Sequence, residues 1–358
     1  MTPQEFRHQL HNWYQLNKRD LPWRNTLDPY QIWLSEIILQ QTRVNQGLPY
    51  FHKFISKFPD IRTLAAASEQ DVLKIWQGLG YYTRARNLHA CAREIIEKFN
   101  GKFPSNYQDL LKLKGVGEYT AAAIASFAFK EPIAVLDGNV FRVLSRVFGI
   151  EAEIKSNSGK KLFTKIASEL LDTLYPDNYN QAIMEFGALQ CTPVNPDCNS
   201  CAFSSSCFAY KNDLQKLLPV KAKKIKVKKR FFNYFIIEFN GSYVLKQRFN
   251  RDIWKGLYDF YLIEDTHKEN IAELNDPLVQ KISGAENLWW EDLKIYYHKL
   301  THQELYLKFY HINIKDKKIM KEIIKLPNFA LYSEEEVNGL PKPILIHNYW
   351  IGKLNSLN

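Results

Sequence analysis

The sequence predicts a protein of two parts: a mainly α-helical region over residues 1–215 and a smaller α/β domain over residues 231–358, joined by a basic linker over residues 216–230. Three observations support this division. The chain has 358 residues, more than one typical domain. Apolar residues recur at helical spacing before the linker, whereas aromatic and β-branched runs follow it. Hydrophobic residues make up 46% of the chain, enough for two packed cores.

Capping residues indicate the helices of the first region. Asp28 followed by Pro29 predicts a helix start, and that helix is expected to run to about Thr42. Ser105 with Gln108 predicts a capping box at another helix start. The first of these helices carries an apolar stripe of Tyr30, Trp33, Leu34, Ile37 and Ile38.

The linker contains a strongly basic run. Residues 221–230 hold seven Lys and Arg side chains and no acidic one, out of a net charge of +10 for the whole chain. Two interpretations are open: a solvated spacer kept extended by self-repulsion, or a strap that follows DNA phosphates. The run by itself favours the spacer.

Strand signals begin after the linker. Arg230–Phe239 and Ser242–Gln247 are rich in aromatic and β-branched residues, and Asn240-Gly241 between them predicts a two-residue hairpin turn. Leu305–Ile314 is expected to form a further strand.

The amino-terminal residues lack the basic and apolar segments of a signal peptide, and no apolar run is long enough to span a membrane. The expected location is the cytoplasm, in association with the nucleoid, with no membrane partner.

Four of the five cysteines fall within residues 191–207, with the spacing C-x6-C-x2-C-x5-C. A cytosolic chain keeps its thiols reduced, which argues against disulfides. A four-cysteine zinc site usually has two C-x2-C pairs, and this loop has one. Unevenly spaced thiolates suit a [4Fe–4S] cluster. The expected ligands are Cys191, Cys198, Cys201 and Cys207, whereas Cys91 is expected to pack in the core.

Residues 111–124 predict two helices joined by a tight turn at Gly115-Val116-Gly117. Glycines allow backbone N–H groups to approach a phosphate, although an ordinary helical hairpin has the same pattern. Asp137 and Asn139 follow at the start of a new helix, where Asp137 is a natural N-cap. A fixed carboxylate can also stabilise the positive charge that develops when an N-glycosidic bond breaks.

The hairpin, the aspartate and the cysteine loop together resemble the helix-hairpin-helix DNA glycosylases of the endonuclease III superfamily. Within it, Ser35–Val44 is similar to the motif of MutY-type adenine glycosylases. The resemblance implies that Glu36 protonates adenine and that Asp137 faces C1′ of the flipped nucleotide. Tyr119 stands where bifunctional relatives have a Schiff-base lysine, so the resemblance implies a monofunctional enzyme.

The resemblance also implies residues that bind DNA or the base. Tyr81 and Gln41 would wedge into the duplex and offset the lost stacking, although tyrosines between helices can also be core filler. Lys114 departs from the family, which often has proline there. The full set of expected binding residues in this region is Arg24, Gln41, Thr42, Tyr81, Gly115, Gly117 and Glu185.

The second domain resembles the Nudix-like carboxy-terminal domain of MutY through Val244–Arg248 and Trp254–Phe260. It lacks the acidic motif with which Nudix hydrolases hold magnesium, so it is expected to read DNA without hydrolase activity. Leu300-Thr301-His302 is similar to the Phe-Ser-His turn with which the family probes 8-oxoguanine. Thr301 keeps the hydroxyl and His302 keeps the ring, whereas Leu300 replaces the aromatic residue. An exposed turn at a strand end has the same composition.

The expected partner is double-stranded DNA with adenine opposite 8-oxoguanine or guanine, and the expected state is a monomer. Two other functions remain as alternatives. Tyr119 and the second domain argue against a bifunctional pyrimidine glycosylase and lyase. Glu36 and Asp137 argue against a non-catalytic DNA-binding protein.

Overall fold

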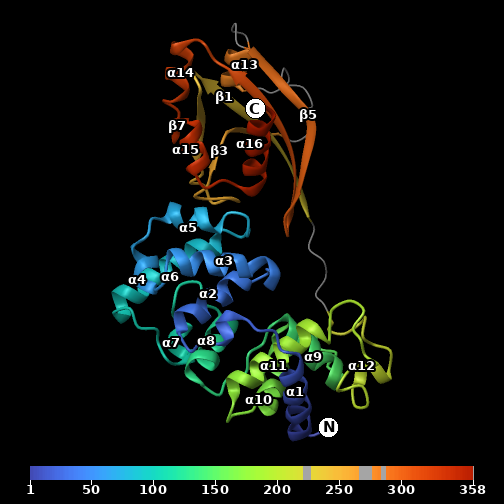
Figure 1. Ribbon diagram of the computed structural model, residues 1–358. Coiled ribbons are helices and arrows are strands. Elements are labelled where there is room, and N and C mark those ends of the chain that lie inside the picture. Colours follow the sequence, from blue (N-terminus) through green and yellow to red (C-terminus); the bar gives the residue numbers. More distant parts are fainter. Residues whose placement is uncertain (221–226, 266–275, 284–287, 358) are drawn as a thin grey trace. The chain divides into compact units, whose positions relative to one another are not determined.

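The structure is a computed structural model that describes residues 1–220, 227–265, 276–283 and 288–357 (Figure 1). It divides into two compact units. The first comprises Met1–Ala66 and Asn87–Lys223, and the second comprises Ala67–Arg86 and Lys224–Asn358.

The first unit is helical, as the sequence predicts. Its helices, in chain order, are α1 (Pro3–Asn17), η1 (Pro22–Arg24, a 3-10 turn), α2 (Pro29–Leu39), α3 (Val44–Lys57), α4 (Ile61–Ala66), α6 (Thr83–Phe99, which begins in the second unit), α7 (Tyr107–Leu110), α8 (Glu118–Phe129), α9 (Gly138–Phe148), α10 (Asn157–Leu170), α11 (Pro176–Leu189) and α12 (Phe208–Lys211).

Among the described residues, two apolar clusters pack several of these helices together. One gathers side chains from α1, α9, α10 and α11, including Phe6, Phe163 and Phe186. The other joins α2 to α8 through Ile32 and the small residues Ala122 and Ala123, which let the two helices approach closely. Cys91 on α6 is fully buried, as predicted.

The structure confirms one predicted helix start and corrects another. The Asp28 side chain accepts a hydrogen bond from the Tyr30 N–H and caps α2, which ends at Leu39 rather than at Thr42. The predicted capping box at Ser105 is wrong. Asn106 is the N-cap of α7, because its side chain accepts from the Asp109 N–H, and asparagine is as good a cap as serine.

The second unit is built on a mixed seven-stranded sheet. The path of hydrogen-bonded strands is β3-β2-β1-β6-β5, with β4 paired to β1 and β7 paired to β2. Strands β1 and β6 are parallel, and the other pairs are antiparallel. The strands are β1 (Lys228–Phe239), β2 (Ser242–Gln247), β3 (Tyr258–Asp259), β4 (Tyr261–Asp265), β5 (Leu288–Lys299), β6 (Gln303–Asn313) and β7 (Phe329–Ser333).

Helices cover both faces of this sheet (Figure 1). The side chains of successive residues of β1 lie on opposite faces of the sheet. Tyr234 belongs to the same apolar cluster as Trp350, whereas Phe235 belongs to the cluster that contains Ile319. The helices of this unit are α5 (Glu69–Trp76), α13 (Pro277–Ser283), α14 (Lys317–Ile323), α15 (Glu334–Gly339) and α16 (Ile344–Leu357).

The predicted hairpin is confirmed. Asn240 and Gly241 both have positive φ, 50° and 74°, as a two-residue primed turn requires. Strand β1 begins two residues before the predicted Arg230, and β6 covers most of the predicted strand. Within the part of the chain that the structure describes, no helix is both long and apolar enough to cross a membrane.

Candidate active site

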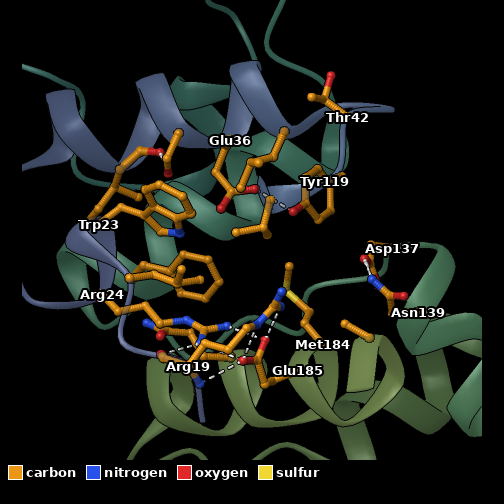
Figure 2. Close-up of a pocket in the computed structure, with 18 residues that line it drawn as sticks. Arg19, Trp23, Arg24, Glu36, Thr42, Tyr119, Asp137, Asn139, Met184 and Glu185 are labelled. Carbon is orange, nitrogen blue, oxygen red and sulfur yellow. Dashed lines mark hydrogen bonds and ion pairs between the residues drawn. The ribbon is translucent and has the colours of Figure 1, made fainter. Parts of the chain in front are cut away.

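A cavity of about 170 Å³ lies in the first unit, between η1, α2, α8, α11 and the start of α9 (Figure 2). It brings together most of the predicted catalytic and base-binding residues of this unit. Those that line it are Arg24, Glu36, Thr42, Tyr119, Asp137, Asn139 and Glu185.

Glu36 is a buried carboxyl group in the wall formed by α2. Its side chain is 5% exposed, and the Tyr119 hydroxyl on α8 donates a hydrogen bond to its Oε2 (Figure 2). Burial raises the pKa of Glu36 to about 7, against the opposing effect of the Tyr119 hydrogen bond, and the nearby Asp137 raises it further. Glu36 therefore keeps a proton close to neutral pH.

Asp137 caps α9, as the sequence predicts. Its Oδ1 accepts a hydrogen bond from the Val140 N–H (2.7 Å), and its Oδ2 accepts one from the Asn139 side-chain amide (2.6 Å). Burial raises the pKa of Asp137, while these donors favour the carboxylate. Arg142 in turn donates to Asn139 Oδ1 (2.8 Å) and fixes the amide.

The close packing behind this aspartate requires a glycine on α11. A Cβ atom at Gly187 would lie 2.6 Å from the Asn139 Cβ atom and 3.1 Å from its backbone. Any side chain at Gly187 would therefore displace Asn139, and with it a donor to Asp137.

The opposite wall carries an ion-paired glutamate. Glu185 is 1% exposed and accepts hydrogen bonds from Arg19 (2.8 and 2.6 Å) and from Arg24 (3.0 and 2.8 Å) (Figure 2). Burial opposes its ionisation, but the two arginines outweigh burial and lower the pKa of Glu185 to about 2. Sequence reasoning missed Arg19, because 166 residues separate it from Glu185 and no local pattern marks it.

The other predicted DNA-binding residues of the first unit lie outside the cavity lining. Gln41 is exposed just after α2, with a left-handed φ of 55°. Gly115 has a φ of 76°, and a Cβ atom there would lie 2.6 Å from the Asn87 Cβ atom. Gly117 is the N-cap of α8 and lies in open space. This turn therefore requires glycine at Gly115 and exposes backbone at Gly117.

Three further predicted residues belong to the second unit. Tyr81 is 48% exposed and precedes α6, whereas its neighbour Tyr82 is buried. Thr301 and His302 are both exposed and form the turn between β5 and β6.

The four clustered cysteines line one cavity next to α9. Arg146 donates to Cys191 Sγ (3.5 Å) and to the Thr192 carbonyl (2.7 Å), and the Phe203 N–H donates to Cys201 Sγ (3.4 Å). Among the described residues, no three His, Cys, Asp or Glu side chains are grouped as ligands of a single metal ion.

Two family models and two solved structures place the chain in the class of base excision DNA repair proteins. The HhH-GPD superfamily base excision DNA repair protein model matches residues 34–169, and the NUDIX domain model matches residues 233–351. A thermostable thymine-DNA glycosylase superposes with a TM-score of 0.55 and 30% identity over 59% of this chain and 97% of that chain. An endonuclease III–DNA complex shares the fold, with a TM-score of 0.52 and 22% identity over 60% of this chain and all of that chain.

A full-length relative identifies the family. The adenine DNA glycosylase of Buchnera aphidicola subsp. Baizongia pistaciae is 36% identical over 349 residues, which cover 96% of each chain. The chain belongs to the adenine DNA glycosylase family, whose members are hydrolases of N-glycosyl bonds.

Proposed function

We propose that this protein excises adenine from DNA in base excision repair, and that its substrate is a duplex with adenine opposite 8-oxoguanine or guanine. It acts as a monomer and as a monofunctional glycosylase. One observation carries the proposal: a buried glutamate with a pKa of about 7 shares a cavity with an aspartate held by donors at a helix start.

Glu36 is the general acid. A purine anion is a poor leaving group, so adenine must be protonated, at N7, as the bond from C1′ to N9 breaks. The Glu36 carboxyl supplies that proton, because burial keeps it protonated at a pH where an exposed glutamate is ionised. Once deprotonated, the same carboxylate accepts a proton from the water that attacks C1′.

Asp137 stabilises the sugar cation. Its two oxygens are already engaged by the Val140 N–H and the Asn139 amide, so the carboxylate is fixed before the reaction. A fixed negative charge stabilises an oxocarbenium ion without reorganisation as the charge develops. Asn139 contributes by holding Asp137 in place.

The wall opposite Glu36 binds the extruded base. Arg24 and Glu185 present charged donors and acceptors to the cavity, and Arg19 holds Glu185 in its ionised form. Buried polar groups of this kind reject bases that leave them unpaired.

Tyr119 makes the enzyme monofunctional. A lyase needs an amine to form a Schiff base at C1′, and a phenol cannot form one. Its hydroxyl instead donates to Glu36, and it therefore orients the acid.

The DNA contacts come from both units. Gly115 and Gly117 expose backbone N–H groups to a phosphate at the start of α8. Gln41 enters the space that the extruded adenine leaves in the stack, and Tyr81 wedges into the duplex. Thr42 contacts the nucleotide from the lining of the cavity. Thr301 and His302 read the base opposite adenine from their exposed turn.

The cysteine loop holds a [4Fe–4S] cluster. The four thiols line one cavity, and their uneven spacing along the chain suits a multi-iron cluster better than zinc. Arg146 donates to Cys191 Sγ and the Phe203 N–H donates to Cys201 Sγ, as is expected of donors that stabilise thiolate ligands. When bound, the cluster would cross-link the loop without reacting with DNA.

Glu36→Gln tests the proposal, because it removes the transferable proton and keeps the shape of the side chain. Single-turnover excision of adenine opposite 8-oxoguanine should fall by at least about 100-fold, the usual contribution of a general acid. Binding to the same duplex should change little. Excision at the wild-type rate would refute the role of Glu36, and loss of binding would show that the substitution damages the site as a whole.

A further inference from the structure

The Thr301–His302 turn is anchored through its backbone to two strands. The Leu300 N–H donates to the Gln303 carbonyl (2.8 Å) and closes the turn between β5 and β6. The N–H of Lys228, the first residue of β1, donates to the His302 carbonyl (2.9 Å). These bonds hold the backbone of the turn, and the Thr301 hydroxyl also forms a hydrogen bond with the Tyr81 hydroxyl. The position of the exposed side chains therefore depends on that contact and on what fixes the base of the turn.

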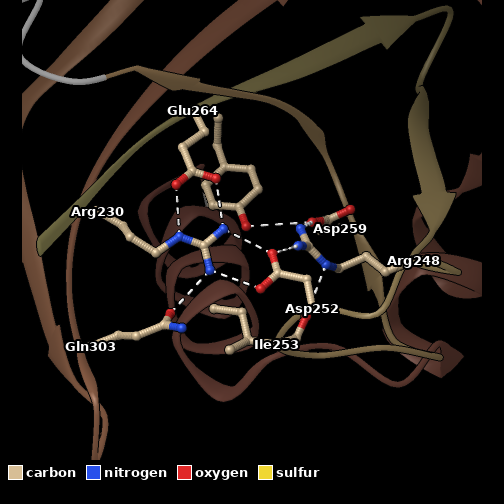
Figure 3. Close-up of polar contacts among 8 residues, drawn as sticks. Arg230, Arg248, Asp252, Ile253, Asp259, Glu264 and Gln303 are labelled. Atoms are coloured by element: carbon tan, nitrogen blue, oxygen red, sulfur yellow. Dashed lines mark hydrogen bonds and ion pairs between the residues drawn. The ribbon is translucent and has the colours of Figure 1, made fainter. Parts of the chain in front are cut away.

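A buried arginine contacts the side chain at that base. Arg230 on β1 is 7% exposed, and its Nη1 donates to Gln303 Oε1 (3.0 Å) (Figure 3). Its other N–H groups donate to Glu264 (2.7 and 2.6 Å) and Asp252 (2.8 and 2.8 Å). All five N–H donors of the guanidinium group are therefore engaged, and it has a single orientation.

A second arginine holds this network from the other side. Arg248 donates to Asp252 Oδ2 (3.1 Å) and to Asp259 Oδ2 (2.6 Å), and Asp259 is fully buried (Figure 3). Asp252 thus bridges two arginines, and neither can turn without breaking bonds to a carboxylate. The network links β1, β3, β4 and the segment after β2 to the first residue of β6.

We propose that Arg230, acting through Gln303, is a positioning residue for the Thr301–His302 turn and so sets how well the protein distinguishes 8-oxoguanine from guanine. This inference rests on the lesion-reading role proposed above for the turn. The two bases differ at C8 and N7, so discrimination depends on a few polar contacts placed accurately. A reading residue needs a rigid support beneath it, and the Arg230 network provides one.

Two substitutions at Gln303 distinguish the effect of losing the acceptor oxygen from the effect of changing the size of the side chain. Gln303→Met keeps the length and removes the oxygen that accepts from Arg230, whereas Gln303→Glu keeps an acceptor. Tyr261→Phe is the matched control, because it removes a hydroxyl that donates to Asp276 (2.9 Å), and neither residue belongs to the Arg230 network. The measurement is the ratio of single-turnover excision rates with 8-oxoguanine and with guanine opposite adenine, in the full chain.

Gln303→Met should lower this ratio by about two- to tenfold, the effect of one net hydrogen bond. Gln303→Glu and Tyr261→Phe should stay within about twofold of the wild type. In a Thr301→Ala, His302→Ala background, Gln303→Met should have no further effect, because coupled residues are not additive. If Gln303→Met lowers the ratio of excision rates by the same factor in that background as in the wild type, the proposal is wrong.

The outcomes distinguish the positioning role of Arg230 from the reading role of the Thr301–His302 turn, on which it rests. If the double substitution lowers the ratio and Gln303→Met does not, the positioning role is wrong and the reading role of the turn stands. If the double substitution leaves the ratio unchanged, the reading role is wrong and the positioning role falls with it. Should Gln303→Met not fold, as judged by its thermal unfolding, Gln303→Asn replaces it, since its shorter side chain draws the oxygen away from Arg230.

Discussion

Replacing Glu36 with glutamine should stabilise the protein at alkaline pH while it removes catalysis. Glutamine has the shape of the protonated glutamate, and its oxygen can still accept the hydrogen bond from Tyr119. It cannot ionise. The substitution therefore relieves the cost of a charge in a side chain that is only 5% exposed.

The magnitude follows from the pKa shift. Burial raises the pKa of Glu36 from 4.5 to about 7, so the folded state holds this proton more tightly than the unfolded state does. The stability that Glu36 contributes is fully present below pH 4.5 and is lost as the pH rises through about 7. A shift of this size corresponds to about 3 kcal/mol at pH 8 and about 1 kcal/mol at pH 5.

Thermal unfolding at several pH values measures this difference. For a helical region of this size, about 3 kcal/mol corresponds to roughly 6–12 °C in Tm. The Tm of Glu36→Gln should thus exceed that of the wild type most at pH 8, and the gap should narrow steadily towards pH 5. Glu151→Gln is the control, because Glu151 is exposed in the same unit and should show no such trend.

A constant Tm difference between pH 5 and pH 8 would refute the reasoning. It would mean that Glu36 ionises alike in the folded and unfolded chains, and the case for a protonated acid at neutral pH would fail. An equal trend in Glu151→Gln would instead indicate a general effect of net charge.

Four more predictions test the site and the second unit. The single-turnover excision rate should fall about tenfold per pH unit above about pH 7, as Glu36 loses its proton; a flat profile up to pH 9 would contradict this. The purified protein should be brown and contain iron, and Cys198→Ser should remove the colour and lower Tm; stoichiometric zinc without iron would contradict the cluster. Borohydride should trap no covalent complex with DNA, since Tyr119 has no amine; trapping abolished by Lys112→Ala or Lys114→Ala would indicate a lyase. Thr301→Ala with His302→Ala should lower the preference for 8-oxoguanine over guanine by about 1–3 kcal/mol, measured as the ratio of excision rates, and an unchanged ratio would give the turn another role.

The sequence predicted best what depends on local chemistry. The Asp28 and Asp137 caps and the Asn240-Gly241 turn are all where the pattern placed them, because each is decided by backbone donors or dihedral angles within four residues. The error at Ser105 has the same origin, since adjacent Ser105 and Asn106 are both good caps and only tertiary packing chooses between them.

The sequence pattern could not predict which side chains are buried by segments that lie far away in the sequence. In the sequence, Glu36 lies at the edge of the apolar stripe formed by Tyr30, Trp33, Leu34, Ile37 and Ile38, a position where a glutamate is ordinarily solvated. It is buried because α8 packs against α2 and brings Tyr119 to it, an approach between residues 83 positions apart. Arg19 and Gln303 were missed for the same reason, as their partners Glu185 and Arg230 are 166 and 73 positions away.

The position of each acid within its helix explains why the pKa values of three carboxyl groups that line one cavity are shifted differently. Glu36 lies in the interior of α2, where intrahelical bonds use the backbone N–H groups. Burial therefore outweighs the hydrogen bond from Tyr119 and the weaker effect of the Arg24 charge, both of which lower its pKa. Asp137 lies at the start of α9, where backbone N–H groups are free to hold a carboxylate. Glu185 also lies within a helix, but two arginines supply the charge that its backbone cannot, and its pKa falls to about 2. A carboxyl group that keeps its proton, a carboxyl group held by donors and an ion-paired carboxylate can therefore share one cavity, because each receives a different set of donors from its place in the fold.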